Sequence, residues 1–453
     1  MITQAAVVLA AGKGTRMNSQ IPKVLHRICG VEMVTLVVES ARAASLDPIV
    51  VVVPRSDSAI RDVLKSKVAY AEQGEPLGSG HALLQAERFL RHTDEVLVLS
   101  GDVPLMSSET LRTLLDHHRK SNACITLLVS TATRPDGLGR IVRSPSGDIV
   151  AIVEEVDADE KTRSMDEING GVYCFRSPWL WKNLGTPSPV TSGEVRLTDL
   201  VAVAAQQGMP VESVEPRFGY EAQGVNTRIE LAQAEAVLRE RIRQRWMLAG
   251  VTISDPPSVY IDSGVELGQD TVLLPNTHVS GNTRIGRDCE IGPNSIVSNS
   301  QIGDRCKITA SVVEDSTVEE EVEVGPFSRV RGGAHLERGV YLGTHAEVKN
   351  SRLGPGTKSA HFSFIGDADV GANVNIGAGT VTCNYDGVRK NKTTIGEGAF
   401  IGSDSMLVAP VEVGPRSSTG AGSVVTKDVP PDSTVVGVPA RVLPKKRDRS
   451  KKE

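Results

Sequence analysis

The chain has 453 residues, about three times the usual length of a single domain, so two or more domains are expected. Its 50 basic and 55 acidic residues leave a formal net charge of −5, which argues against a dedicated nucleic-acid binder. The apolar fraction of 40% excludes global disorder. No aliphatic run is long enough to span a bilayer, and six scattered cysteines without a C-x-x-C pair indicate neither a disulfide framework nor a zinc site. We therefore expect a cytoplasmic protein.

The first half of the chain, residues 1–226, alternates short aliphatic runs with amphipathic stretches. The runs at 5–10, 49–53, 96–100 and 125–129 are typical of buried strands, and those at 31–43, 81–90 and 110–120 have helical spacing. This alternation predicts an α/β domain with a mostly parallel sheet covered on both faces. Ligands of such sheets bind beyond the carboxyl ends of the strands, so the loops that follow the strands are the places to look for chemistry.

Residues 227–249 contain neither glycine nor proline and are rich in helix formers. The stretch predicts one long helix that ends at Gly250 and links the two halves.

After the helix, over residues 250–453, the hydrophobic period changes to six. Aliphatic residues recur at 273, 279, 285, 291 and 297, again from 318 to 348, and again from 395 to 413. This period favours a solenoid in which three hexads close one coil, with about ten coils of roughly 18 residues. The register slips around 348–370, and residues 381–394 are interpreted as an inserted loop.

The last nine residues, 445–453, include six basic ones. Such a run is typical of a solvated tail, and the alternative is that it lends positive charge near an anionic ligand.

A glycine-rich loop, AGKGTRM at 11–17, follows the first predicted strand. Glycines there let the backbone approach a phosphate closely, and successive N–H groups form an anion-binding nest. Arg16 and Lys23 supply two cations suited to a polyphosphate. The alternative is a surface loop with two solvated cations.

Asp102 follows the buried run 96–100 directly. A single carboxylate at the carboxyl end of a strand suits Mg²⁺, which prefers one or two carboxylates together with substrate phosphate oxygens. The alternative is that Asp102 caps a turn. Gln73 and the loop at 77–81 form a second glycine-rich segment that leads into a helix.

Three segments, LAAGKGTRM at 9–17, PKVLH at 22–26 and GDVPL at 101–105, resemble in order the signature segments of nucleotidylyltransferases that make nucleoside-diphosphate sugars. Across nearly the whole chain the resemblance is to the bifunctional GlmU family. It implies a Rossmann-like nucleotidylyltransferase domain, a linker helix and a left-handed parallel β-helix of hexapeptide repeats. The implied function is acetylation of glucosamine-1-phosphate by acetyl-CoA, followed by transfer of UMP from UTP to N-acetylglucosamine-1-phosphate. The products are pyrophosphate and UDP-N-acetylglucosamine, a precursor of peptidoglycan and lipopolysaccharide.

The resemblance also implies site residues in the first half. Those implied for the uridine nucleotide are Leu9, Ala10, Ala11, Gly12, Lys23, Gln73, Gly78, Ser79, Ser100, Gly101 and Asp102. Those implied for the sugar are Gly139, Glu154 and Asn169, and those for Mg²⁺ are Asp102 and Asn226. In the implied reaction a sugar-phosphate oxygen attacks the α-phosphorus in line, while Arg16 and Lys23 stabilise the developing charge. Ser79 and Gly170 stand where the family usually has threonine.

A hexad solenoid can be a passive oligomerisation module, so a second activity needs residues of its own. The candidates are Arg331, Lys349, His361, Asn375, Asn384 and Tyr385. A lone histidine in a repeat is more often structural. His361, however, lies at a break in the hexad register, and an imidazole suits a general base near neutral pH.

By resemblance, His361 takes the proton from the glucosamine amine as it attacks acetyl-CoA. Arg331 and Lys349 would bind the sugar phosphate, Asn375, Asn384 and Tyr385 the sugar and acetyl region, and Ala378, Ser403 and Ala421 the CoA. The family's site lies between neighbouring prisms, which implies a homotrimer.

Two positions of this second site depart from the family. Phe364 replaces a tyrosine at the sugar-phosphate position, and Gly437 replaces an arginine at the CoA site, for which Arg441 or the basic tail is a candidate substitute. Two other readings stay open: a sugar-1-phosphate nucleotidylyltransferase whose β-helix only forms trimers or regulates, and a non-catalytic scaffold with both folds.

Overall fold

The computed structural model describes residues 2–12, 14–55, 58–132, 135, 137–185 and 195–443. Lys13 and the basic tail therefore lie outside the described residues. The chain divides into two compact units, Met1–Leu238 and Arg239–Glu453. Among the described helices, none has the length and apolar character needed to cross a membrane.

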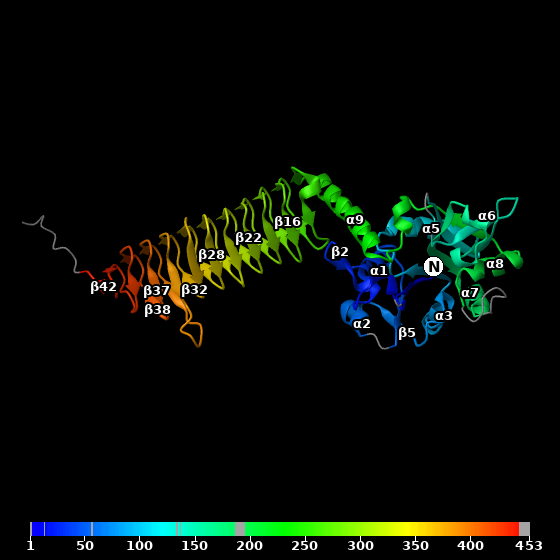
Figure 1. Cartoon of the computed structure of the whole chain (residues 1–453), viewed down its shortest axis with the longest axis horizontal. Coiled ribbons are helices and arrows are strands. Elements are labelled where there is room, and N and C mark those ends of the chain that lie inside the picture. Colours follow the sequence, from blue (N-terminus) through cyan, green and yellow to red (C-terminus); the bar gives the residue numbers. More distant parts are fainter. Residues whose placement is uncertain are drawn as a thin grey trace, which may run out of the picture. The chain divides into compact units, whose positions relative to one another are not determined.

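A nine-stranded sheet forms the centre of the first unit (Figure 1). Its main path runs in the order β11 (Val211–Val214), β7 (Ile125–Thr131), β10 (Glu167–Arg176), β6 (Glu95–Ser100), β1 (Gln4–Leu9), β4 (Ile49–Pro54) and β5 (Ala69–Gln73). Only β10 runs antiparallel to its neighbours on this path, and β8 (Arg140–Arg143) and β9 (Ile149–Val153) extend sideways from it. The predicted α/β fold with a mostly parallel sheet is confirmed.

Successive residues of the strands point to opposite faces of this sheet. Ala5 and Val7 of β1 join one core cluster, whereas Ala6 and Val8 join the other. Each cluster is closed by helices on its own face. The first includes residues of α3 (Ser79–Leu84), α4 (Glu87–Leu90), α7 (Ser177–Asn183) and α8 (Asp199–Gln206), and the second includes residues of α1 (Met33–Ala43), α2 (Ala59–Leu64) and α5 (Ser108–Lys120).

The prediction of one helix over residues 81–90 is wrong. The structure has two short helices there, α3 and α4, joined where the backbone tightens. The N–H groups of Gln85 and Ala86 donate to the carbonyls of Ala82 and Leu83, three residues back. Ala86 and Leu90 are both buried in the core, so the apolar spacing continues across the break although the helix does not.

Helix α9 (Arg228–Leu248) follows the first sheet, and the division between the two units falls inside it. The expected domain boundaries at 226 and 250 therefore stay a prediction.

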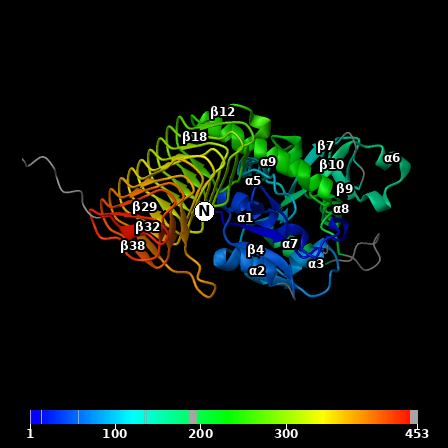
Figure 2. The same cartoon turned by 60° about the vertical axis from the view of Figure 1, so that its left-hand side comes forward.

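The second unit is a three-sided parallel β-helix, as its hexad period predicts. Its three sheets contain 12, 10 and 9 strands, and the strands pair in parallel with the equivalent strands of neighbouring coils, except for the last strand of the first of these sheets (Figures 1 and 2). The aliphatic residue of each hexad points inward, as Leu273, Ile291 and Ile308 show on one face. The left-handed hexapeptide fold is confirmed.

The coils are less uniform than the expected 18 residues. Arg284 pairs with Gln301, and Gln301 with Thr317, so these coils hold 17 and 16 residues. Across the predicted slip, Tyr341 pairs with Lys358 and Lys358 with Asn375. The slip is thus a run of 17-residue coils, and the strand ladder continues through it.

The inserted loop is shorter than expected. Residues 381–383 form β34 (Val381–Cys383) and pair with the next coil, so only 384–392 leave the prism before β35 (Thr393–Ile395) (Figure 1). The last strand of the described residues, β42 (Arg441–Val442), turns back antiparallel to β41 (Thr434–Val436).

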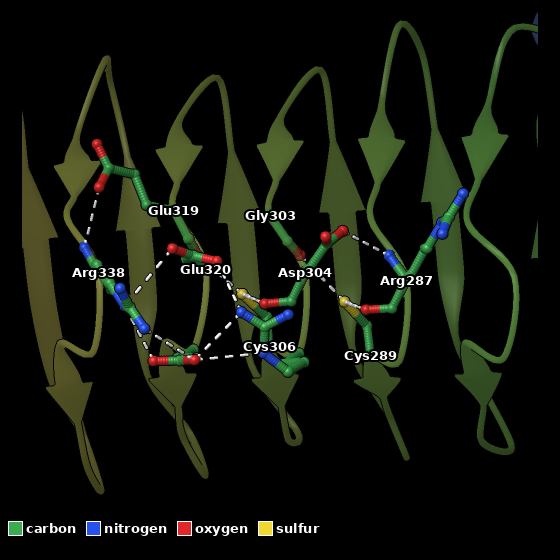
Figure 3. A network of polar contacts seen from close by, with 10 residues as sticks. Arg287, Cys289, Gly303, Asp304, Cys306, Glu319, Glu320 and Arg338 are labelled. Carbon is green, nitrogen blue, oxygen red and sulfur yellow. Dashed lines mark hydrogen bonds and ion pairs between the residues drawn. The ribbon is translucent and has the colours of Figure 1, made fainter.

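Polar contacts tie neighbouring coils together on the prism wall, as Figure 3 shows. The Cys289 thiol donates to the Gly303 carbonyl at 3.1 Å, and the Cys306 thiol donates to that of Glu319 at 2.9 Å. Arg338 donates through Nε to Glu321 at 3.0 Å. Both thiols therefore serve as buried donors between coils.

Candidate active sites

Five predicted residues of the first unit converge at the carboxyl edge of its sheet. Lys23 forms an ion pair with Asp102, which follows β6, and its Nζ donates to Oδ1 of Asn226 at 3.1 Å. Arg16 Nη2 donates to the same Oδ1 at 2.9 Å. Ser100 Oγ donates to the other Asp102 oxygen at 2.6 Å. The structure thus joins three segments that are far apart in the chain.

These side chains fit a divalent cation. A carboxylate oxygen of Asp102 and the amide oxygen of Asn226 both face the Lys23 ammonium, so the two oxygens already converge on one positive charge. Oxygen donors of these two kinds are the ligands that Mg²⁺ prefers.

The loop after β1 lies beside the loop after β6. Gly101 donates its N–H to the Leu9 carbonyl at 2.9 Å, and a β-carbon on Gly101 would come within 3.1 Å of that oxygen. So close an approach favours glycine at this position. It holds the segment 9–12 against the segment that carries Asp102.

Gln73, at the end of β5, lies on the far side of the same edge. A hollow of about 300 Å³ opens here, lined among others by Ala11, Gly12 and Gln73. Gln73 Nε2 donates to the Gly78 carbonyl at 3.2 Å, and Ser79 Oγ accepts from the Leu197 N–H at 3.1 Å. The hydroxyl retained at position 79 is therefore used within the fold.

The three residues implied for the sugar also come together. The Asn169 N–H donates to the Gly139 carbonyl at 2.9 Å, and a β-carbon on Gly139 would lie 3.4 Å from Oε2 of Glu154. Thr198 donates to Glu154 at 3.2 Å. Burial raises the pKa of the Glu154 carboxyl, against the opposing effect of that hydrogen bond.

Sequence reasoning missed Arg140, the residue that follows Gly139 and packs next to this cluster. Its side chain is only 1% exposed, and it forms an ion pair with Glu155 at 2.7 Å and donates to the Met165 carbonyl at 3.1 Å. Arg140 thus ties the neighbours of Gly139 and Glu154 together. Its position inside the run RIVR of a strand is the only signal that the sequence offers.

On the prism, Arg331 and Lys349 lie side by side on neighbouring coils, at the ends of β25 (Arg329–Arg331) and β28 (Ala346–Lys349). Lys390 of the inserted loop joins them. Contact with Lys390 and the positive charges of Lys390 and Arg331 lower the pKa of Lys349, and the Asp367 carboxylate opposes this shift. Three neighbouring cations attract a phosphate group, and Arg331 also forms an ion pair with Glu347 at 2.7 Å.

Sequence reasoning also missed Lys390, because the loop's own folding brings it there. Tyr385 and Lys390 form an antiparallel bridge, which turns the loop back toward the prism. The Tyr385 hydroxyl donates to Gly387 within the loop at 2.7 Å, and its side chain is exposed.

The other predicted residues lie around this cluster on two faces. Asn384 Nδ2 donates to Asp367 at 2.5 Å, while Phe364 lies on β31 (Ser363–Gly366) in register with Glu347. Asn375 lies on a different sheet, and His361 is exposed at the corner between the two. Among the described residues, no hydrogen bond or ion pair joins His361 or Asn375 to Arg331 or Lys349.

The residues implied for CoA follow one edge of the prism. The Asp404 N–H donates to the Ala378 carbonyl at 2.6 Å, and the Gly422 N–H donates to that of Ser403 at 2.8 Å, so the corners with Ala378, Ser403 and Ala421 stack on successive coils. Gly437 lies at the last such corner with φ of 97°, a conformation that favours glycine over arginine. Arg441 lies on the adjacent strand β42.

Comparisons with known proteins agree with this division. Residues 6–183 match the family model of the MobA-like NTP transferase domain, and residues 264–299 and 392–427 match that of the bacterial transferase hexapeptide. The chain is 44% identical to a protein of Heliobacterium modesticaldum called Bifunctional protein GlmU, over 96% of each chain. Proteins of the same name from Pelobacter propionicus and Streptococcus agalactiae are 44% and 41% identical over 95% of each chain.

Proposed function

This chain belongs to the bifunctional GlmU family, and we propose here how its two units share the work of that family. The protein is a two-step transferase. It acetylates glucosamine-1-phosphate with acetyl-CoA, and it transfers UMP from UTP to N-acetylglucosamine-1-phosphate, giving UDP-N-acetylglucosamine and pyrophosphate. In our proposal residues 1–226 carry uridylyl transfer and residues 250–453 carry acetyl transfer.

For uridylyl transfer, the edge formed by residues 9–12, Gln73 and Asp102 would hold the uridine nucleotide. Gly139, Glu154 and Asn169 would hold the sugar. A phosphate oxygen of the sugar attacks the α-phosphorus of UTP, and pyrophosphate leaves from the opposite side. Arg16 and Lys23 stabilise the negative charge that develops on the transferred and leaving phosphates. No covalent intermediate with the protein is needed.

The family uses a divalent metal ion, and we propose that it is Mg²⁺ held by Asp102 and Asn226. A metal ion there supplies neutralisation of phosphate charge. The support is the convergence of the two side-chain oxygens on the Lys23 ammonium.

For acetyl transfer, Arg331, Lys349 and Lys390 would bind the phosphate of glucosamine-1-phosphate. The amine nitrogen attacks the acetyl carbonyl carbon, the CoA thiolate leaves, and His361 takes the proton from the nitrogen. The corners with Ala378, Ser403 and Ala421 would hold the CoA along the prism edge.

We further propose a homotrimer. In the described part of the chain His361 and Asn375 make no polar contact with the three-cation cluster, so residues of another prism would complete the site. An exposed column on one prism face, with Tyr260, His278 and Ile296 in register, would be available for such packing, with the Arg239 guanidinium over the Tyr260 ring at its start.

The observation that carries this proposal is the convergence of Arg16, Lys23, Asp102 and Asn226 at the sheet edge. Two assays on the purified chain test it: pyrophosphate release with UTP and N-acetylglucosamine-1-phosphate, and thiol release with acetyl-CoA and glucosamine-1-phosphate. We expect both. Pyrophosphate release without thiol release would mean that the β-helix serves only as a trimerisation or regulatory module. The absence of both activities would indicate a non-catalytic scaffold.

A further inference from the structure

The start of helix α9 is held by a reciprocal pair of hydrogen bonds. Thr227 Oγ1 accepts from the Glu230 N–H at 3.2 Å, and Glu230 Oε2 accepts from the Thr227 N–H at 2.8 Å. This is the capping box that commonly begins a helix. Here the same Glu230 oxygen also accepts from the N–H of Asn226, at 2.7 Å. The carboxylate therefore fixes the backbone of Asn226 itself in addition to capping the helix.

The backbone before Asn226 is fixed as well. The Val225 N–H donates to the Asp102 carbonyl at 2.8 Å, which ties it to the loop after β6. Asn226 is thus held by Asp102 on one side and by Glu230 on the other. Between these two anchors its Oδ1 faces both Lys23 and Arg16.

A second tether joins α9 to the segment that carries Lys23. Arg228 Nη1 lies 3.1 Å from Nδ1 of His26, and the His26 N–H donates to the Lys23 carbonyl at 3.2 Å. Because a guanidinium can only donate, Nδ1 must be the unprotonated nitrogen, and the neutral ring carries its hydrogen on Nε2. That atom is buried and has no partner among the described residues. A buried N–H donor without a hydrogen-bond partner costs free energy. The fold keeps the contact between Arg228 and Nδ1 although it leaves the Nε2–H of His26 without a partner among the described residues.

We propose that Glu230, assisted by the Arg228–His26 pair, is a positioning residue for uridylyl transfer that presents the Asn226 amide oxygen to the meeting point of Lys23 and Asp102. The inference rests on the proposed function of that site. Without the Glu230 carboxylate the backbone of Asn226 loses its anchor, and the oxygen is no longer held at one place. The affinity for the divalent metal ion falls, while acetyl transfer on the prism is unaffected.

The experiment compares three variants of the full-length chain. Glu230→Ala removes both roles of the carboxylate, Glu230→Gln keeps an acceptor oxygen, and Thr227→Ala removes only the helix-capping hydroxyl. Metal affinity is measured in two ways: as the Mg²⁺ concentration for half-maximal uridylyl transfer, and as Mn²⁺ binding in the presence of UTP by electron paramagnetic resonance. Thiol release from acetyl-CoA shows that each preparation is folded.

We expect Glu230→Ala to weaken metal binding about tenfold or more by both readouts, as removal of an outer partner of a metal ligand typically does. Glu230→Gln should recover most of the affinity, and Thr227→Ala should stay near wild type. An equal loss in Thr227→Ala and Glu230→Ala would overturn the proposal, because helix capping alone would explain it. Unchanged metal binding in Glu230→Ala would overturn it too. If Asp102→Ala and Asn226→Ala also left metal binding unchanged, the proposed metal site itself would be wrong.

Discussion

The ring of Phe364 lies across Gly366: a β-carbon at position 366 would come within 2.6 Å of Phe364 Cζ and 2.8 Å of Asn384 Nδ2. Gly366 is the register partner of Lys349 on the next coil. The tip of the ring therefore points into the column that contains Lys349 and, one coil before it, Arg331. A hydroxyl on that tip would lie beside the proposed phosphate site.

This relationship predicts the effect of Phe364→Tyr. The added hydroxyl should donate to the sugar phosphate and strengthen acceptor binding by about 1.5–3 kcal/mol, typical of a hydrogen bond to a charged group. Steady-state kinetics should show a KM for glucosamine-1-phosphate lowered about tenfold to a hundredfold, with little change in the KM for acetyl-CoA. An unchanged or raised KM for the sugar phosphate would show that another donor already serves there.

Asp102→Ala should abolish uridylyl transfer and leave acetyl transfer near wild type. Asp102 supplies one of the two oxygens that face Lys23, and it lies in the first unit while His361 lies in the second. Both assays on one preparation decide the matter. Parallel loss of the two activities in a folded variant would contradict separate sites.

His361→Ala should do the reverse. Loss of a general base lowers kcat by about 10² to 10⁴, so thiol release should fall by that factor while pyrophosphate release persists. Near-wild-type thiol release from His361→Ala across neutral pH would make this histidine structural.

Glu154→Gln should change stability in a pH-dependent way. Burial raises the pKa of Glu154 above its ordinary value of 4.5, so the folded protein binds this proton more tightly than the unfolded chain does. The contribution of the wild-type carboxyl is therefore present below pH 4.5 and is lost as pH rises through the raised pKa. Thermal unfolding should show Glu154→Gln gaining stability relative to wild type from acid to neutral pH. A stability difference between Glu154→Gln and wild type that does not change with pH would contradict the raised pKa of Glu154.

Glu155→Ala should destabilise the first unit by about 1.5–3 kcal/mol, because it leaves the buried Arg140 guanidinium without its anionic partner. Glu167→Ala is the matched control, since it breaks the exposed ion pair with Arg143 and should cost less than about 1 kcal/mol. Chemical denaturation of the two variants measures the difference. Equal losses of unfolding free energy in the two variants would mean that the hydrogen bonds from Arg140 to backbone carbonyls are enough to stabilise its buried guanidinium.

Periodicity predicted most of the fold, because a hexad or an aliphatic run is a local signal that one face of the chain must be buried. It failed at the break between α3 and α4, because the apolar spacing continues there although the helix does not. Strand β10 was missed because Gly170 and Gly171 interrupt its apolar pattern at a shift in register.

The candidate sites were predictable where a residue follows a strand directly, as Asp102 does. Site residues could not be predicted where a segment distant in the sequence folds back to the site. Lys390 depends on the folding of its own loop, and Arg140 and Glu230 act through neighbours of the residues that a motif identifies. The individual roles of these site residues stay predictions.

The backward turn of β42 has a consequence for how the protein behaves in crowded solution. A parallel β-helix ends in a coil whose backbone N–H and C=O groups have no next coil to pair with, and such an edge is a template for another chain. Because β42 runs antiparallel to β41, it occupies that edge on one of the three faces with a strand that does not repeat the coil geometry. On that face the turn leaves no parallel edge that matches the coil of another molecule, which disfavours end-to-end stacking there.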